Sequence, residues 1–433
     1  MNALLPYVVE LERHLNALHL SEEQWEAWCD SCLDGTPSRE LRRLVPLADL
    51  KEQGAFFTAP GLARQVATTF GASTDDESVY CDPACGVGDL LLAVASGLPL
   101  APAVSETLAL WGRRLTGCDL SAVFVRAAKA RLALLAMQRC GSREPIAPAV
   151  LDDLLPAITV GDALRCHDLY SAADRIIMNP PFRTMSAPEG CEWSAGGLNA
   201  AAVFTETAIV HSRDGTRIAA ILPDVLRSGS RYERWRRMVD DSALLEEVRT
   251  YGPFDLHADV DVFLLCMTVD RNGDAHSRSH GDWSWIATDL DDHVSKHFTV
   301  RVGAVVPHRD PETGPEYPYV HSRSLPPWST LERIAEKRSF AGTVFRPPFV
   351  AVRRTSGPRD RNRAVATIVL GEQCVAVENH VIVCRPADGS IARCRALLER
   401  LRSSKTDEWL NRRIRCRHLT TASVAEIPWW DDP

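Results

Sequence analysis

The sequence predicts an α/β protein built on a doubly wound sheet, with a helical segment before the sheet and an α+β domain after it. Strand-like and helix-like segments alternate from Val79 to Asp270, which is typical of a largely parallel sheet. Each of the first four strand-like segments ends in a polar residue, and glycines follow the first. The pattern changes in a polar stretch after Asp270, so three domains are predicted: residues 1–50, 51–275 and 276–433.

The composition indicates a cytoplasmic globular protein. Of the 433 residues, 45% are hydrophobic and 24% are charged, which is ordinary for such a chain. No apolar run is long enough to cross a membrane, and the amino terminus lacks the pattern of a signal peptide. The 13 cysteines are an odd number scattered along the chain, which favours reduced thiols over a disulfide framework.

Cys29 and Cys32 have the spacing of half a zinc site. No second pair of ligands lies near them in sequence, so buried helix cysteines are the preferred interpretation and no metal is expected. The histidine pairs His276/His280 and His293/His297 have four-residue spacing without cysteines or carboxylates fixed around them, and are expected to face solvent.

The charge is unevenly distributed along the chain. Between Phe340 and Thr420 there are 16 Lys and Arg residues against 7 Asp and Glu residues, a net charge of +9. Because the whole chain carries −8, the remainder carries −17. A basic carboxyl-terminal segment on an acidic body predicts a polyanionic partner for that segment alone, with an arginine-rich solvated surface as the alternative.

Residues 1–50 are expected to form helices. Apolar residues recur at helical spacing from Val8 to Leu18, and Ser21 begins a capping box for a second helix that extends to Cys32. A short arginine-rich helix is predicted from Ser38 to Leu44.

The stretch Phe57-Thr58-Ala59-Pro60 leads into a helix predicted from Gly61 to Phe70. Thr58 is placed to cap that helix, with Pro60 in its first turn. The aromatic residues before the helix are equally suited to covering an adenosine and to packing in the core.

A strand from Val79 to Asp82 is followed by a Gly86-x-Gly88 turn and by a helix that begins near Asp89. Glycine lets the backbone approach a ligand closely, and α/β sheets bind nucleotides at the carboxyl ends of their strands. The Lys-Ser/Thr pair of a phosphate loop and the third glycine of a dinucleotide fingerprint are missing. The turn therefore predicts a nucleoside site of a different kind.

Two further strands each end in an acid. Asp119 follows the strand that begins at Leu115, and a carboxylate at this place is suited to accept both hydroxyls of a ribose. After a helix from Ala122 to Gln138, a third strand beginning at Ala157 ends at Asp162, which is suited to hold an adenine amino group.

The fourth strand delivers Asn179-Pro180-Pro181-Phe182 to its carboxyl end. The two prolines fix φ and remove two backbone donors, so the loop presents mainly hydrogen-bond acceptors. Asn179 adds a side-chain carbonyl, and Phe182 adds a flat apolar face. This corner suits a planar ring with an exocyclic amine, because two acceptors take the two hydrogens and the aromatic ring stacks.

The remaining elements continue the alternation and then change character. Helices are predicted at 200–212 and 231–240, and strands at 216–223, 244–250 and 259–270, the last two paired as a hairpin. The carboxyl-terminal part is expected to hold strands at 344–355, 364–370 and 375–385, and helices at 391–403 and 406–413. Five arginines in one of its turn regions are suited to contact phosphates and base edges: Arg353, Arg354, Arg359, Arg361 and Arg363.

Taken together, Phe57-Thr-Ala-Pro60, Asp82-Pro-Ala-Cys-Gly-Val-Gly88, Asp119, Asp162 and Asn179-Pro-Pro-Phe182 resemble the ordered motifs of the gamma-class adenine-N6 DNA methyltransferases of restriction-modification systems. The resemblance covers about Glu52 to Asp270, and more loosely Val377–Val383 and Leu419–Pro428, which are similar to target-recognition segments. Ala59 departs from the Thr-Pro usual in the family, and the acidic body is a second departure.

This resemblance implies a Rossmann-like methyltransferase sheet, S-adenosylmethionine as the cofactor, and double-stranded DNA with an extruded adenine as the substrate. The implied catalytic residues are Asn179, Pro180, Pro181 and Phe182. The implied cofactor-binding residues are Phe57, Thr58, Asp82, Pro83, Ala84, Gly86, Gly88, Asp119, Leu120, Asp162 and Ala163.

Two alternatives to this function remain open. The same acceptor corner serves a methyltransferase acting on a guanine amine in RNA or on a glutamine amide in a protein. The chain is also compatible with a DNA-recognising modification subunit that is inactive without a partner specificity or restriction subunit.

Overall fold

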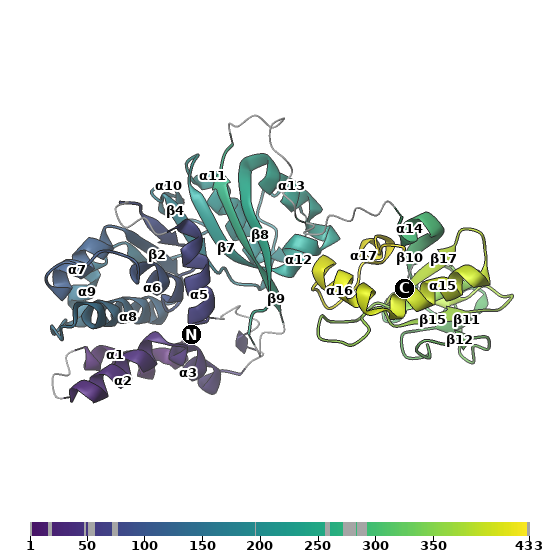
Figure 1. The fold of residues 1–433 in the computed structure, drawn as a ribbon, viewed down its shortest axis with the longest axis horizontal. Helices are drawn as coiled ribbons and strands as arrows, with labels where there is room; N and C mark the ends of the chain where they lie inside the picture. Colours follow the sequence, from purple (N-terminus) through teal and green to yellow (C-terminus); the bar gives the residue numbers. More distant parts are fainter. Residues whose placement is uncertain are drawn as a thin grey trace. The chain divides into compact units, whose positions relative to one another are not determined.

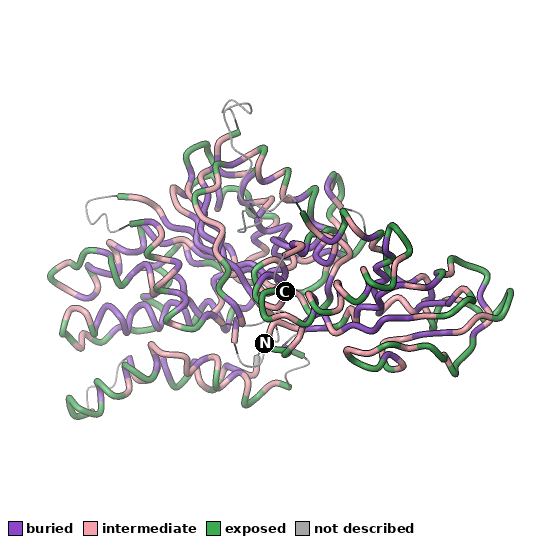
Figure 2. The backbone as a smooth tube through the Cα atoms, turned by 45° about the vertical axis from the view of Figure 1, so that its right-hand side comes forward, coloured by how far each residue is buried: buried purple, intermediate pink, exposed green. Residues whose placement is uncertain are grey.

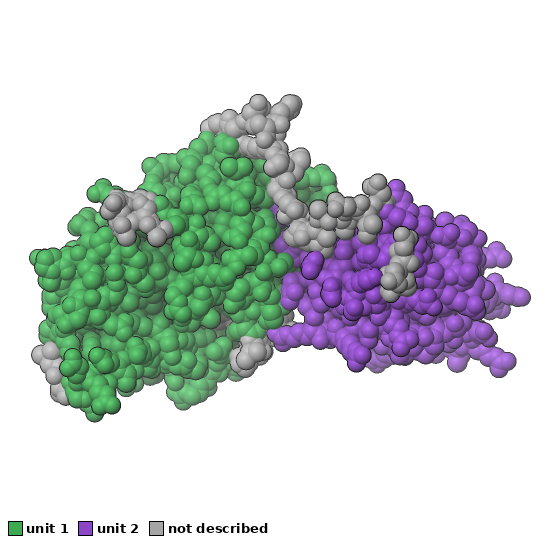
Figure 3. Space-filling model, in the orientation of Figure 1, with its two compact units in different colours: residues 1–226, 232–282 green, residues 227–231, 283–433 purple. Residues whose placement is uncertain are grey.

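The computed structural model describes residues 2–15, 20–46, 49–50, 57–71, 77–194, 196–255, 260–271, 283 and 292–430. The chain divides into two compact units (Figure 3). Unit 1 contains residues 1–226 and 232–282, and unit 2 contains residues 227–231 and 283–433. The predicted boundary near residue 275 and the pair His276/His280 lie outside the described residues, so the predicted domain limits stay a prediction.

Unit 1 is built on a seven-stranded sheet in the order β3-β2-β1-β4-β7-β9-β8 (Figure 1). Strands β1, β2, β3, β4 and β7 run parallel, whereas β9 is antiparallel to both β7 and β8. The strand bounds are β1 Tyr80–Asp82, β2 Leu115–Asp119, β3 Ile158–Val160, β4 Arg175–Met178, β7 Arg217–Pro223, β8 Ala243–Pro253 and β9 Asp261–Val269. The predicted α/β, doubly wound fold class is confirmed, including the hairpin of β8 with β9.

The direction in which strands are added reverses next to β1. The chain runs outward from β1 through β2 to β3, and then returns to β4 on the other side of β1, so that Cys81 pairs with Thr116 on one side and with Ile176 on the other. The connections above β1 and β4 therefore leave in opposite directions, which opens a crevice at their carboxyl ends. Asp82 and Asn179 follow at this crevice.

Helices cover the strands of unit 1, whose residues form the buried interior (Figure 2). Their bounds are α1 Leu5–His14, α2 Glu22–Leu33, α3 Thr36–Leu44, α5 Pro60–Ala67, α6 Asp89–Ala95, α8 Ala122–Cys140, α11 Ala200–His211 and α13 Glu233–Ser242. The amino-terminal helices α1 and α2 pack on α8 (Figure 1). Ser21 forms the predicted capping box of α2. None of the described helices is both long and apolar enough to cross a membrane.

Several short elements were not predicted from the sequence. They include helices α7 Val104–Gly112, α9 Pro148–Leu154 and α10 Asp168–Ser171, and the hairpin of β5 Thr184–Ser186 with β6 Gly197–Asn199. These segments have fewer than ten residues, too few for apolar periodicity to be distinctive. The hairpin directly follows the Asn179–Phe182 corner and therefore contributes to the crevice.

Unit 2 contains a five-stranded sheet in the order β10-β17-β14-β15-β12 and a three-stranded sheet in the order β13-β11-β16. The strand bounds are β10 Phe298–Val302, β11 Glu316–Val320, β12 Thr330–Leu331, β13 Lys337–Ser339, β14 Phe349–Arg353, β15 Ala366–Val369, β16 Ala376–Val377 and β17 Val381–Pro386. The helices of this unit include α14 Val294–His297, α15 Ile391–Arg402, α16 Ser404–Arg413 and α17 Thr421–Ala425. Helices α15 and α16 lie close to their predicted limits.

One predicted strand of unit 2 is divided. The stretch 375–385 turns at Glu378, whose carbonyl accepts a hydrogen bond from the Val381 backbone N–H at 3.0 Å. As a result β16 joins the three-stranded sheet and β17 joins the five-stranded sheet. An uninterrupted strand was the wrong prediction here, because the apolar alternation continues across the turn.

Candidate functional site

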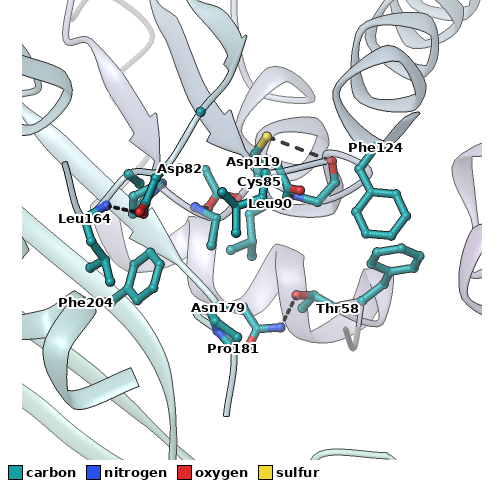
Figure 4. Close-up of a pocket in the computed structure, with 18 of the residues that line it drawn as sticks. Thr58, Asp82, Cys85, Leu90, Asp119, Phe124, Leu164, Asn179, Pro181 and Phe204 are labelled. Atoms are coloured by element: carbon teal, nitrogen blue, oxygen red, sulfur yellow. Dashed lines mark hydrogen bonds between the residues drawn. The ribbon is translucent and has the colours of Figure 1, made fainter. Parts of the chain in front are cut away.

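A cavity of about 250 Å³ lies at the carboxyl ends of β1 to β4 in unit 1 (Figure 4). It unites the segment before α5, the glycine turn after β1, the acid-ended strands β2 and β3, and the corner after β4. The predicted residues that line it are Phe57, Thr58, Asp82, Pro83, Ala84, Gly86, Asp119, Leu120, Asp162, Ala163, Asn179 and Pro181. Three predicted residues are not part of its lining: Gly88, Pro180 and Phe182.

The two glycines of the turn have different surroundings. Both have positive φ, +52° at Gly86 and +85° at Gly88, which favours glycine at each position. A Cβ on Gly86 would meet the Phe57 ring at 3.5 Å beside the cavity. A Cβ on Gly88 would meet the Cβ of Ala128 at 3.0 Å, so this glycine allows the turn to pack closely against α8. Gly88 therefore affects the site through the packing of the turn on α8 and does not line the cavity.

Asp119 fastens the end of β2 to the glycine turn. Its Oδ2 accepts the Gly86 backbone N–H at 3.1 Å and its Oδ1 accepts the Ser121 backbone N–H at 2.8 Å. A carboxylate offers about four acceptor sites, so these two bonds leave capacity for further donors from a ligand.

Three carboxylates line the cavity: Asp82, Asp89 and Asp119. Burial, together with the negative charges of Asp119 and Asp89, raises the pKa of Asp82 to about 8, although the Ala84 backbone N–H opposes the shift. Burial also raises the pKa of Asp119 and of Asp89, and Arg131 partly offsets the effect on Asp89. Carboxylates that line a cavity and are largely removed from water favour a cationic ligand.

Apolar side chains line the cavity at both of its ends. Leu120 is 61% exposed although it is a large hydrophobic residue, and it lines the cavity. Leu164 and Phe204 lie together at one end of the cavity, and Phe124 lies at the other (Figure 4). Asp162 accepts the Leu164 backbone N–H at 3.1 Å, which fixes the carboxylate beside these apolar groups. This end of the cavity suits a flat ring with a polar edge.

The corner after β4 faces the segment before α5. Asn179 Nδ2 donates a hydrogen bond to Thr58 Oγ1 at 2.9 Å (Figure 4). The predicted capping role of Thr58 is wrong, because Ala59 is the N-cap of α5 and has no side-chain cap bond. The hydroxyl of Thr58 accepts from Asn179 instead, while Pro60 does occupy the first turn.

The Phe182 side chain packs against Phe254 and is not part of the cavity lining. Its ring packs edge-to-face on Phe254, with ring centroids 5.6 Å apart, and its carbonyl accepts from Asn199 Nδ2 at 3.0 Å. Phe57 packs in the same way on Phe124 at 5.1 Å and also borders the cavity. Phe57 thus packs against another aromatic ring and also lines the cavity. That it covers an adenosine stays a prediction, and Phe56 lies outside the described residues.

Several lining residues were not predicted from the sequence. They are Cys85, Asp89, Leu90, Phe124, Gly161, Leu164, Arg183, Met185 and Phe204. Most of them adjoin a predicted motif, so extending each motif by two residues finds them. Phe124 and Phe204 lie on helices, and only the fold brings them to the cavity.

The five arginines predicted to contact DNA lie in unit 2 and differ in exposure. Arg359 and Arg361 are exposed in the turn after β14. Arg353 and Arg354 are half-buried, and their guanidinium groups donate to the backbone carbonyls of Leu325, Leu419 and Asn379.

The prediction for Arg363 is wrong. It is fully buried, and its guanidinium donates to the carbonyls of Leu410, Ile414, Ser356 and Cys416. Burial lowers its pKa to about 10. A group that holds four carbonyls in the interior has no surface to offer a phosphate, so its role is to anchor the turn against α16.

Cys29 and Cys32 are buried on α2, as predicted. Burial raises the pKa of Cys32 to about 11, which keeps the thiol protonated. Across the part of the chain that the structure describes, no three His, Cys, Asp or Glu residues are grouped so as to hold a metal ion.

The sequence matches no protein-family model and no curated protein. Among solved structures it is similar to the type IIL restriction-modification enzyme MmeI in complex with DNA, with 11% identity, a TM-score of 0.53, and 90% of this chain and 70% of that chain covered. It also matches the modification subunit ascribed to a type I restriction enzyme from Vibrio vulnificus YJ016, with 19% identity, a TM-score of 0.41 and coverage of 58% and 51%.

A third similar structure is the type IIG restriction endonuclease BpuSI, with 14% identity, a TM-score of 0.41 and coverage of 87% and 58%. The chain thus spans between half and three fifths of the Vibrio subunit and of BpuSI. At these identities the likeness concerns the fold alone, a doubly wound, Rossmann-like sheet carrying an additional domain.

Proposed function

We propose that this chain transfers a methyl group from S-adenosylmethionine to the exocyclic N6 of adenine in a specific DNA sequence, as the modification enzyme of a restriction-modification or related defence system. One observation carries the proposal: Asn179 and Pro181 line the same cavity as the glycine turn and the carboxylates around it. An acceptor for an amine and a site for a cationic nucleoside are thereby joined.

The lining fits S-adenosylmethionine, which supplies an electrophilic methyl group on a sulfonium centre. Gly86, which has no side chain, leaves room for the methionine portion of the cofactor. The carboxylates of Asp82 and Asp89 complement the positive charges of the cofactor. Asp119 is suited to the ribose, and Asp162 with Leu120 to the amino edge and face of the adenine. The predicted neighbours Phe57, Thr58, Pro83, Ala84 and Ala163 complete this cofactor site, and Gly88 supports it from the α8 side.

The chemistry asked of the protein is to hold and activate the amine. Asn179 Oδ1 and the Pro180 carbonyl would each accept one N–H of the adenine amine, which draws the nitrogen toward tetrahedral geometry and localises its lone pair. S-adenosylmethionine would supply the methyl group, and the acceptor dipoles of Asn179 and Pro180 would stabilise the positive charge that develops on the nitrogen. The proton then leaves to solvent, so no strong general base is needed at position 179.

The base must leave the duplex to reach the corner, and Phe182, whose neighbours Pro181 and Arg183 line the cavity, is proposed to stack on it. Arg183 supports a nucleotide substrate, since it is exposed, lines the cavity beside this corner, and brings a positive charge that a neutral glutamine amide does not need. Phosphate groups attract such a charge.

The test is a transfer assay with labelled cofactor on DNA, RNA and protein, followed by identification of the modified base. N6-methyladenine in DNA is the expected product. Label in RNA or protein would instead indicate that the acceptor is a guanine amine or a glutamine amide. Activity that requires an added specificity or restriction subunit would identify the chain as a dependent modification subunit.

Cofactor affinity is expected to fall as the pH drops below about 8, because that is the pKa to which burial and neighbouring acids raise Asp82 in the ligand-free protein. A cationic ligand stabilises the ionised carboxylate and lowers this pKa, so binding below it must release a proton. Affinity then decreases by up to about tenfold per pH unit. Calorimetry between pH 6 and about 9 measures the slope.

Asp82→Asn is the control for that slope. The ligand's own amino group titrates in the same range, and its contribution remains in the variant. A variant with the same pH profile as the wild type would remove Asp82 from the effect.

Replacing Arg359 and Arg361 by alanine is expected to weaken DNA binding and to flatten its salt dependence by about one unit of slope for each phosphate that is no longer neutralised. Both side chains are exposed, so folding should be unaffected. Fluorescence anisotropy at several salt concentrations measures the slope. An unchanged slope would refute the assignment. The buried Arg363 is excluded from this test because its replacement would disrupt the turn.

A further inference from the structure

The hydrogen bond between Asn179 and Thr58 joins two segments that are 121 residues apart in sequence. Its length is 2.9 Å from Asn179 Nδ2 to Thr58 Oγ1, and both residues line the cavity. Thr58 is only 5% exposed. The bond is part-buried, at the place where the proposed substrate amine is held.

The orientation of the Asn179 amide decides whether the corner can accept hydrogens. A side-chain amide has an oxygen that accepts and a nitrogen that donates, and a half-turn about its last torsion exchanges them. If the nitrogen faced the amine, two donors would oppose one another. A partner that holds the nitrogen therefore presents the oxygen.

Thr58 itself is held by a buried ionic group. Its backbone N–H lowers the pKa of the Asp89 carboxylate, against the upward shift that burial causes. Asp89 Oδ1 in turn accepts Arg131 Nη1 at 2.8 Å, and Arg131 is fully buried on α8. Because the hydroxyl is not used as a helix cap, it remains committed to Asn179.

We infer that Thr58 is a positioning residue whose hydroxyl holds the nitrogen of the Asn179 amide, so that the carbonyl oxygen is presented to the substrate amine. This inference rests on the proposed function, and it assigns Thr58 a role in the rate of transfer in addition to any contact with the cofactor. A hydroxyl that serves only the cofactor would instead determine cofactor affinity.

The test compares Thr58→Val, which keeps the shape and removes the hydroxyl, with Thr58→Ser, which keeps the hydroxyl. Thr58→Val is expected to lower kcat by about 10- to 100-fold, as loss of a supporting hydrogen bond does at other sites. The factor by which kcat falls should exceed any factor by which the cofactor Kd rises, and Thr58→Ser should recover most of the lost rate. Thr216→Val is the matched control, since Thr216 is 3% exposed and its hydroxyl donates to the Ala173 carbonyl away from the cavity.

Two results would overturn the inference. One is a Thr58→Val variant that loses cofactor affinity while its kcat at saturation is unchanged. The other is equal loss of kcat in the valine and serine variants, which would indicate packing of the methyl group.

A readout that does not depend on transfer separates this inference from the proposed function. In protein labelled with ¹⁵N asparagine, the Asn179 side-chain NH₂ signal, assigned with Asn179→Ala, should shift in Thr58→Val and not in Thr216→Val. If no acceptor is methylated by the wild type, the proposed function fails while this signal still tests the hydrogen bond. An unshifted signal would overturn the positioning role.

Discussion

Asn179→Ala is expected to reduce methyl transfer by about a thousandfold or more while leaving cofactor binding nearly unchanged. Alanine removes the side-chain oxygen that would accept one hydrogen of the adenine amine. The amine lone pair then stays delocalised in the ring, and the charge that develops on nitrogen has lost one of its two acceptor dipoles. Pro181 has no polar side-chain atom, so it cannot replace the lost acceptor at the corner.

The size of the effect distinguishes chemistry from binding. Asn179 lies on the β4 side of the cavity, whereas the proposed contacts of the cofactor come mainly from the ends of β1, β2 and β3. The expected result is a loss confined to kcat, with an unchanged calorimetric cofactor Kd and an unchanged melting temperature. Single-turnover kinetics with bound DNA measure the chemical step directly. A variant that turned over at the wild-type rate would remove Asn179 from the mechanism.

The strand tips could be predicted from the sequence because their signals are local. Asp82, Asp119, Asp162 and Asn179 each follow a short apolar strand, and parallel strands place their carboxyl ends at one edge of a sheet. The common cavity then follows from the topology, without knowledge of any side-chain contact. The same argument predicted the glycine turn, whose two positive φ values the structure shows.

The hydrogen-bond partners could not be predicted, because burial is decided by residues far away in sequence. Thr58 before a proline has the local pattern of a helix cap, and only the proximity of Asn179 gives its hydroxyl another partner. Arg363 in a polar turn has the same local pattern as Arg361, yet α16 covers the first and leaves the second exposed. Residue type and spacing carry no information about such covering.

The role of Arg131 in unit 1 was not predicted from the sequence. It interrupts the apolar run of α8, and in the structure it is 0% exposed. Its guanidinium donates to the carbonyls of Cys32 and Val87 at 2.9 and 2.7 Å, to Asp89 Oδ1 at 2.8 Å and to the Asp34 carbonyl at 3.2 Å. One side chain thus joins the amino-terminal helices to the glycine turn and to an acid of the cavity.

Arg131→Met is expected to lower the free energy of unfolding of unit 1 by about 3 to 5 kcal/mol, the usual cost of breaking a buried ion pair. Methionine has a similar volume, so packing contributes little to the loss. The carboxylate of Asp89 remains buried without its cation, and three carbonyls lose a donor. Cofactor affinity should fall as well, because Val87 belongs to the turn that shapes the cavity.

The pH dependence identifies the uncompensated carboxylate as the cause. In the wild type, burial raises the pKa of Asp89 and Arg131 opposes that shift. Removing Arg131 raises this pKa further. When a carboxyl group has a higher pKa in the folded than in the unfolded protein, the free energy of unfolding decreases as the pH rises through the folded-state pKa. The destabilisation should therefore be largest at high pH and should shrink as Asp89 becomes protonated.

A double variant completes the test. Asp89→Asn removes the charge, so Arg131→Met combined with Asp89→Asn should be more stable at high pH than Arg131→Met alone, as denaturant unfolding followed by hydrogen exchange in α8 would measure. Arg363→Met is the matched control in unit 2, because it removes another fully buried arginine whose loss should leave cofactor binding unchanged. If the double variant were no more stable than Arg131→Met, the missing hydrogen bonds to the carbonyls of Cys32, Val87 and Asp34 would account for the destabilisation. Arg131 would then anchor the amino-terminal helices without compensating the charge of Asp89.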